Sequence, residues 1–131
     1  RAMMPSGGWR MVETAIRDGS ATLVDARNDA SFRGAEKSGV AARAGRLPGA
    51  VHQEGAAAFD AATGRLKPKA ELARLFGALP EGDTIPFCNT GQQAATNWFV
   101  LSEVLGRKPV RLYDGSMSEW TGDPDRPVAA D

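Results

Sequence analysis

Short apolar runs alternate with helix-like patterns along the first half of the chain. Residues 10–18 place their apolar side chains on one helical face and are followed by Gly19, which predicts a helix and its end. The run Thr22–Asp25 has the pattern of a buried strand that ends in a carboxylate. A loop rich in glycine, alanine and arginine is expected at residues 38–45, and a second short strand at residues 49–52.

The same alternation continues in the second half. Residues 68–79 carry apolar side chains at spacings of three and four, with a proline in the first turn, and predict an amphipathic helix. Strands and helices are then expected to alternate to the end of the domain: a strand at Thr84–Phe87, a helix at residues 94–105, a strand at residues 110–113 and a short final helix that closes at Trp120.

This succession of elements predicts one α/β domain. Strands that alternate with helices indicate a parallel sheet with helices on both faces. A chain of 131 residues has the length of a single domain with a single core. We expect the domain to occupy residues 1–122, followed by an extended or frayed tail at residues 123–131, which contains two prolines.

Composition and charge exclude several kinds of function. The 16 basic and 16 acidic side chains balance, so bulk charge favours neither nucleic acid nor an anionic membrane as a partner. One cysteine and one histidine exclude an internal disulfide and a Cys/His metal cluster, and we expect neither a metal nor another cofactor. No apolar run approaches the ~20 residues that span a bilayer, and no targeting segment is visible. Because the chain begins Arg1-Ala2, we expect a processed product or a piece of a longer protein.

The only cysteine, Cys88, opens a loop that is expected at residues 88–93, where water can reach the thiol. Reactive sites in parallel sheets lie beyond the carboxyl ends of the strands, where loops lead into helices. Gly91 permits backbone angles that turn successive N–H groups inward, and the start of the next helix adds further donors. This arrangement predicts a cradle that stabilises the Cys88 thiolate. The alternative is a small buried hydrophobic residue at a strand end, which is common for cysteine.

Residues 88–94 read CNTGQQA, which resembles the active-site loop of the rhodanese family of sulfurtransferases, where a cysteine opens a six-residue loop with glycine at its fourth position. Three further stretches resemble family motifs in the same order: LVDAR at residues 23–27, GRLPGA at residues 45–50, and YDGS at residues 113–116, followed by Glu119-Trp120. Together they span residues 22–120, nearly the whole chain. The likeness is greatest to the catalytic, C-terminal half of tandem-domain rhodaneses.

The resemblance implies a central, mostly parallel five-stranded sheet with helices on both faces. It also implies a ping-pong reaction in which Cys88 takes a sulfane sulfur from a small-molecule or protein donor as a persulfide. The persulfide then passes the sulfur to a thiol or to cyanide. The substrate-binding residues of the loop are then Asn89, Thr90, Gly91, Gln92 and Gln93. A second rhodanese domain upstream in the parent chain is a further implication.

Two departures from the family pattern concern the sulfur donor. Tandem-type enzymes often carry an arginine four residues after the position of Arg27, and here that residue is Ser31. We therefore expect Arg27, Arg33 and the loop amides to bind an anionic donor. The loop side chains are neutral, whereas enzymes that prefer thiosulfate tend to carry basic residues there. We expect weak thiosulfate turnover and a preference for mercaptopyruvate or a persulfide.

Each remaining candidate residue has a structural explanation beside a functional one. Asp25 and Arg27 end a strand and form either a structural ion pair, a substrate contact, or both. Arg46 precedes a Pro-Gly pair and is expected mainly to support a turn. His52 is more often structural in such a position than a catalytic base, and Ser116 has no predictable direction. The helix after the loop carries three side chains that we expect in the core: Trp98, Phe99 and Leu101.

Two other functional classes stay open. Cysteine-dependent phosphatases also place a thiolate in an anion cradle, but they need an arginine six residues after the cysteine, and that position is Ala94. A non-catalytic rhodanese-like binding module is the second alternative. Such modules usually lose the cysteine or the glycine of the loop, and both Cys88 and Gly91 are present. The sequence therefore favours a sulfurtransferase over both.

Overall fold

A computed structural model describes residues 5–131, so residues 1–4 of the expected domain lie outside the described residues. The strands are β1 (Ser6–Gly7), β2 (Thr22–Asp25), β3 (Val51–His52), β4 (Thr84–Phe87) and β5 (Leu112–Tyr113). The helices are α1 (Trp9–Asp18), α2 (Asp29–Arg33), α3 (Lys69–Phe76), α4 (Gln92–Trp98) and α5 (Ser116–Trp120), with a 3₁₀ helix η1 (Gly55–Ala58) and a π-helix η2 (Phe99–Val104).

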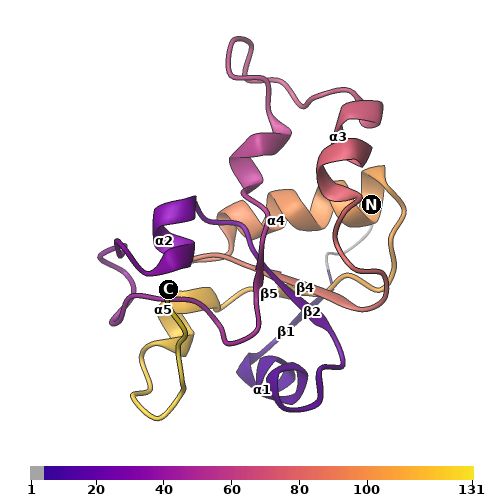
Figure 1. Cartoon of the computed structure of the whole chain (residues 1–131). Coiled ribbons are helices and arrows are strands. Elements are labelled where there is room, and N and C mark those ends of the chain that lie inside the picture. The colour runs from indigo at the N-terminus through magenta and orange to yellow at the C-terminus, as the bar shows by residue number, and fades with distance from the viewer. Residues whose placement is uncertain (1–4) are drawn as a thin grey trace.

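The strands form a parallel sheet, as the sequence predicts. Strands β3, β2 and β4 pair in that order, and β1 pairs with β5. A parallel bridge between Thr84 and Val110 joins the two groups and places β5 beside β4. Helix α1 lies on one side of this sheet, and α3 and α4 lie on the other (Figure 1). The prediction of an α/β domain with both faces covered is confirmed.

Pro86 explains why the sheet divides into three and two paired strands. Thr84 pairs fully with the segment before β5: its N–H donates to Pro109 and its carbonyl accepts from Arg111. The next donor of β4 toward β5 would be residue 86, and proline has no N–H. The ladder between β4 and β5 therefore stops, while the opposite edge of β4 continues its pairing with β2 to Asp25.

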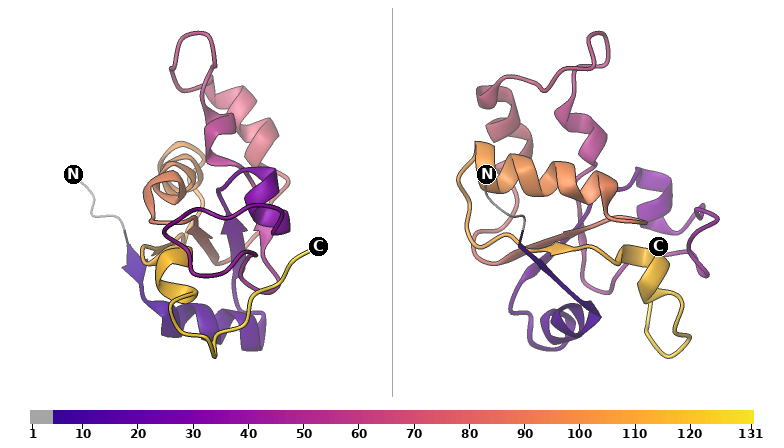
Figure 2. Two further views of the ribbon diagram at one scale, coloured as in Figure 1. Left: turned by 90° about the vertical axis from the view of Figure 1, so that its left-hand side faces the viewer. Right: turned by 180° about the vertical axis from the view of Figure 1, so that it is seen from behind.

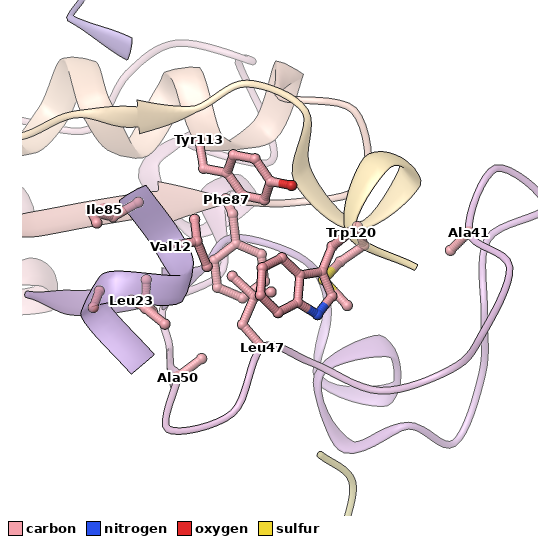
Figure 3. Packing of buried hydrophobic residues seen from close by; sticks show 11 residues of the cluster. Val12, Leu23, Ala41, Leu47, Ala50, Ile85, Phe87, Tyr113 and Trp120 are labelled. Carbon is pink, nitrogen blue, oxygen red and sulfur yellow. The ribbon is translucent and has the colours of Figure 1, made fainter. Parts of the chain in front are cut away.

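Side-chain alternation along the strands divides the core between the two faces. Leu23, Ile85 and Phe87 pack on the α1 side, together with Tyr113 and Trp120, in the cluster drawn in Figure 3. The opposite face buries Val24 and the apolar side chains of α3, α4 and η2, which include Leu72, Phe76, Trp98 and Leu101. The expectation that Trp98 and Leu101 are core residues is confirmed. That for Phe99 is wrong: its side chain is 46% exposed, because it lies on the outer face of the helix.

Several boundaries differ from those expected. Helix α4 begins at Gln92, two residues before the expected start at 94, because Gly91 already has the left-handed conformation that precedes the first turn. The strands expected at residues 49–52 and 110–113 are only two residues long, as β3 (Val51–His52) and β5 (Leu112–Tyr113). Among residues 5–131, no helix is both long enough and apolar enough to cross a bilayer.

The segment after Gly122 first turns, at residues 123–126, where the Arg126 N–H donates to the Asp123 carbonyl, and residues 127–131 are then held against the domain. Ala129 and Arg46 exchange both backbone hydrogen bonds in an antiparallel bridge, at 2.8 and 2.9 Å. The indole N–H of Trp120 donates to the carbonyl of Pro127 at 2.7 Å. The contact requires glycine at position 45, since a β-carbon there would lie 2.7 Å from the Ala129 carbonyl oxygen. Figure 2 shows this segment running beside the loop that precedes β3.

Candidate active site

Cys88 directly follows β4 at the carboxyl end of the sheet. Its side chain is only 2% exposed, so the expectation of a water-exposed thiol on a turn is wrong. The thiol points inward and packs with Ala26, Ala94 and Leu112. Cys88 also lines an open hollow of about 300 Å³, together with four other predicted loop residues: Asn89, Thr90, Gln92 and Gln93. The cysteine is therefore shielded from bulk water and lies beside an open hollow.

Gly91 supplies the direct contact to the sulfur. Its N–H donates to Cys88 Sγ with a donor–acceptor distance of 3.0 Å. The contact depends on a left-handed backbone at Gly91, where φ is 96°. A β-carbon at this position would lie 2.9 Å from the backbone oxygen of Asp114, so space and conformation both require glycine. Such an N–H donor stabilises a thiolate more than a neutral thiol.

The backbone of Cys88 is held from the opposite side by the start of α5. Ser116 Oγ accepts a hydrogen bond from the Cys88 N–H at 3.0 Å, and the N–H of Met117 donates to the Cys88 carbonyl at 3.0 Å. The N–H of Ser118 donates to the carbonyl of Asn89 at 2.9 Å. Ser116 has a positive φ of 54°, a conformation that costs a non-glycine residue about 1–3 kcal/mol. The YDGS stretch thus contacts the cysteine itself.

Asp25 and Arg27 form a buried ion pair that reaches the loop. Arg27 Nη2 lies 2.7 Å from Asp25 Oδ2, and the two side chains are 3% and 0% exposed. The same guanidinium donates to the Gly45 carbonyl at 2.8 Å and to Asn89 Oδ1 at 3.4 Å. Arg27 therefore links β2, the loop before β3 and the cysteine loop. This is the structural interpretation of the pair, and contact with substrate stays a prediction.

The other basic and imidazole candidates contact different partners. Arg33 is half exposed and pairs with Asp29 one turn earlier on α2, at 2.7 Å. Arg46 lies over the Phe32 ring at 4.3 Å and pairs with Asp131. His52 Nε2 lies 2.6 Å from the Arg27 carbonyl oxygen, and its ring stacks on Phe32. These contacts agree with the structural interpretations of Arg46 and His52.

Two residues of the hollow were missed by the sequence analysis. Ser38 and Val40 form its outer wall, and the Val40 side chain is 52% exposed. The composition of residues 38–45 indicates only a loop, and no local pattern shows that the loop lies beside the cysteine. Ser38 and Val40 are uncharged. Apart from the Cys88 thiol, every side chain that lines the hollow is therefore neutral.

Among residues 5–131, no group of three His, Cys, Asp or Glu side chains could hold a metal ion. Tyr113 is buried, and burial together with its hydrogen bond to Glu119 raises the pKa of its hydroxyl. It stays protonated at neutral pH and donates to Glu119 at 2.8 Å.

Comparisons with known proteins point to one family. The family described as "Rhodanese-like domain" matches residues 10–123. A thiosulfate sulfurtransferase of Corynebacterium glutamicum is 38% identical over 111 residues, which cover 79% of this chain and 36% of that protein. A probable 3-mercaptopyruvate sulfurtransferase of Pseudomonas aeruginosa is 41% identical over 114 residues, covering 82% of this chain and 38% of that relative. The chain thus spans little more than a third of the length of these two relatives.

Two further similarities extend this result. The sulfur carrier protein TtuD of Thermus thermophilus is 32% identical over 124 residues, with 87% of this chain and 43% of that protein covered. The anaerobic ergothioneine biosynthesis enzyme from Chlorobium limicola superposes with a TM-score of 0.83 at 22% identity, covering 95% of this chain and 32% of that one. At 22% identity, the similarity to the Chlorobium limicola enzyme is a similarity of fold.

Proposed function

The chain belongs to the rhodanese family, and from this premise we propose that it is a sulfurtransferase that works through a persulfide on Cys88. The observation that carries the proposal is the hydrogen bond from the Gly91 N–H to Cys88 Sγ, in a residue that lines an open hollow. A buried structural cysteine needs neither an N–H donor at 3.0 Å nor a place in the wall of an open hollow. The relatives named as thiosulfate and 3-mercaptopyruvate sulfurtransferases support the same class of reaction.

The proposed reaction has two displacement steps at sulfur. The Cys88 thiolate attacks the transferable sulfur of the donor, which is the sulfane sulfur of thiosulfate or the thiol sulfur of mercaptopyruvate. A new S–S bond forms while the donor's S–S or C–S bond to that sulfur breaks. The leaving group, sulfite from thiosulfate or pyruvate enolate from mercaptopyruvate, departs with the electron pair. A thiol or cyanide acceptor then attacks the outer persulfide sulfur and returns the thiolate. The Gly91 N–H stabilises the sulfur anion at both ends of this cycle.

Intact-mass measurement tests the function directly. After incubation with thiosulfate or mercaptopyruvate, we expect the protein to gain the mass of one sulfur atom and to lose it again on addition of cyanide, with release of thiocyanate. The chain has one cysteine, so the adduct has one possible thiol site. No adduct with either donor would favour the non-catalytic binding module. Hydrolysis of p-nitrophenyl phosphate without a sulfur adduct would favour the phosphatase.

We propose that the neutral hollow disfavours thiosulfate, a dianion, relative to mercaptopyruvate. The side chains that line it carry no cation, and Arg27, the nearest buried cation that contacts the loop, is already bound to Asp25 and Gly45. Position 31 is a poor place to restore charge, because the Ser31 side chain is 6% exposed and an arginine there would disturb packing. Thr90 is exposed and lines the hollow, so a lysine there can reach a bound anion.

The substitution Thr90→Lys is expected to lower the thiosulfate KM about tenfold, equivalent to about 1.4 kcal/mol of added attraction. The KM for mercaptopyruvate, which carries one negative charge, should fall by a smaller factor of about threefold. The matched control is Thr14→Lys, which adds the same charge on the exposed face of α1. Equal effects of the two lysines, or micromolar thiosulfate KM in the unsubstituted protein, would show that charge in the hollow does not select the donor.

We also propose that sulfur is exchanged with small-molecule or protein donors and acceptors. A second rhodanese domain upstream stays a prediction from the resemblance. The curated relatives are more than twice as long as the matched segment, which is compatible with a further domain in such proteins.

A further inference from the structure

Ser116 is unusual in both conformation and hydrogen bonding. Among residues 5–131 it is the one non-glycine residue with a positive φ, and its side chain is fully buried. Its single hydroxyl proton is directed to the Tyr113 carbonyl, at 2.8 Å. The lone pairs of the same oxygen therefore face the N–H of Cys88, at 3.0 Å. The buried network permits only this polarity, because a carbonyl cannot donate and an N–H cannot accept.

We propose that Ser116 is a positioning residue that keeps Cys88 Sγ in reach of the Gly91 N–H. This inference rests on the proposed function of Cys88 as a nucleophile. Ser116 and Met117 together hold the N–H and the carbonyl of Cys88, which restricts rotation of its backbone on both sides of the α-carbon. The direction of the Cα–Cβ bond, and with it the 3.0 Å contact from Gly91 to Sγ, follows from that restriction.

The choice of serine over glycine supports a role for the hydroxyl. The backbone at position 116 would be relaxed with glycine, since φ is 54°. A serine there keeps an unfavourable conformation and supplies the oxygen that Cys88 needs. Without that oxygen the Cys88 N–H is buried without an acceptor, and the first residue of the loop is free to tilt away from Gly91. The sulfur anion then loses its donor.

Two substitutions distinguish the effect of the Ser116 hydroxyl from the effect of the strained backbone at that position. Ser116→Ala removes Oγ and keeps the strain, whereas Ser116→Gly removes Oγ and relieves it. Ser118→Ala is the matched control on the same helix, because the Ser118 hydroxyl donates to the Gly115 carbonyl and not to the cysteine loop. All three variants leave the charged neighbours of the loop in place, which include Arg27 and Asp114.

The readout is the rate of iodoacetamide alkylation of Cys88 as a function of pH, which requires no sulfur donor. We expect both Ser116 variants to react about tenfold more slowly near pH 6.5, and their half-maximal rate to move up by about one pH unit. Near pH 10, where the thiol is ionised in every variant, the rates should agree within about twofold. Ser118→Ala should follow the unsubstituted profile.

The inference would be overturned if Ser116→Gly had the same alkylation rate at each pH as the unsubstituted protein, because position 116 would then matter only for its backbone. An equal shift in Ser118→Ala would overturn it as well, since any loosening of α5 would have the same effect. If Ser116→Ala does not fold, Ser116→Gly still tests the inference, because glycine relieves the backbone strain at position 116. Failure of the unsubstituted protein to form a persulfide would reject the sulfurtransferase and leave these alkylation profiles interpretable.

Discussion

Replacing Cys88 with serine is expected to abolish persulfide formation and to lower sulfur transfer by at least about a thousandfold. The serine hydroxyl can still accept the Gly91 N–H, but it is not ionised at neutral pH and forms no persulfide. No other thiol exists in the chain to replace the lost nucleophile. The measurement is thiocyanate formation from cyanide with thiosulfate or mercaptopyruvate, together with the intact mass after incubation with donor.

The fold is expected to survive this substitution, and that is what makes the result interpretable. Serine is close to cysteine in volume, and a hydroxyl at this position keeps the Gly91 N–H as its partner. Thermal unfolding of Cys88→Ser should therefore be cooperative and close to that of the unsubstituted protein. Cys88→Ala serves as a control, because it removes the nucleophile and also the acceptor for the Gly91 N–H. Measurable sulfur transfer by folded Cys88→Ser would reject Cys88 as the nucleophile.

The central elements were predictable because their patterns are local. TIPF is buried along its whole length and TLVD in its last three residues, and both become paired central strands at the predicted boundaries. Helix α1 begins one residue before the predicted start at 10, because Trp9 completes the first turn after Gly8. In these segments, side-chain periodicity and the tertiary environment agree.

The elements that were missed depend on contacts between distant segments. β1 consists of Ser6–Gly7, a dipeptide without strand character, and it exists because its backbone pairs with β5 more than one hundred residues later. Helix α2 has five residues and starts from Asn28, whose side chain accepts the Ser31 N–H. The C-terminal segment is likewise held by its bridge to Arg46. Short elements of this kind have too few residues for a periodic signal.

The candidate site likewise has a part that depends on neighbouring residues in the sequence and a part that depends on distant segments. The cysteine loop could be identified from its own residues, because Cys88 and Gly91 are neighbours in sequence and in space. The direction of Ser116 and the position of the Val40 wall could not, since each depends on how another segment folds back on the loop. The thiol was expected to face water for a similar reason: a loop predicts exposure, but α4 and β5 cover this one.

The second large effect is expected at the buried ion pair. Arg27→Met removes one partner and leaves the carboxylate of Asp25 charged and fully buried, which is expected to lower the free energy of unfolding by about 3–5 kcal/mol. Domains of this size are usually stable by only about 5–15 kcal/mol, so the variant should unfold at a clearly lower urea concentration. Asp25→Asn should be destabilising too, because it leaves the guanidinium without its counter-charge.

The double variant Asp25→Asn/Arg27→Met is expected to recover part of this loss, since no unpaired charge stays buried. Its sulfur transfer should nevertheless stay low, because Asn89 and the Gly45 carbonyl both lose the donor that holds the loops together.

Arg33→Met is the matched control, because the pair that Arg33 forms with Asp29 is exposed. That variant should leave the unfolding midpoint unchanged, and a higher KM for thiosulfate would support the predicted role of Arg33 in donor binding. A double variant with full activity would show that Arg27 acts only on stability, and an additive loss in the double variant would show that the two charges do not stabilise each other.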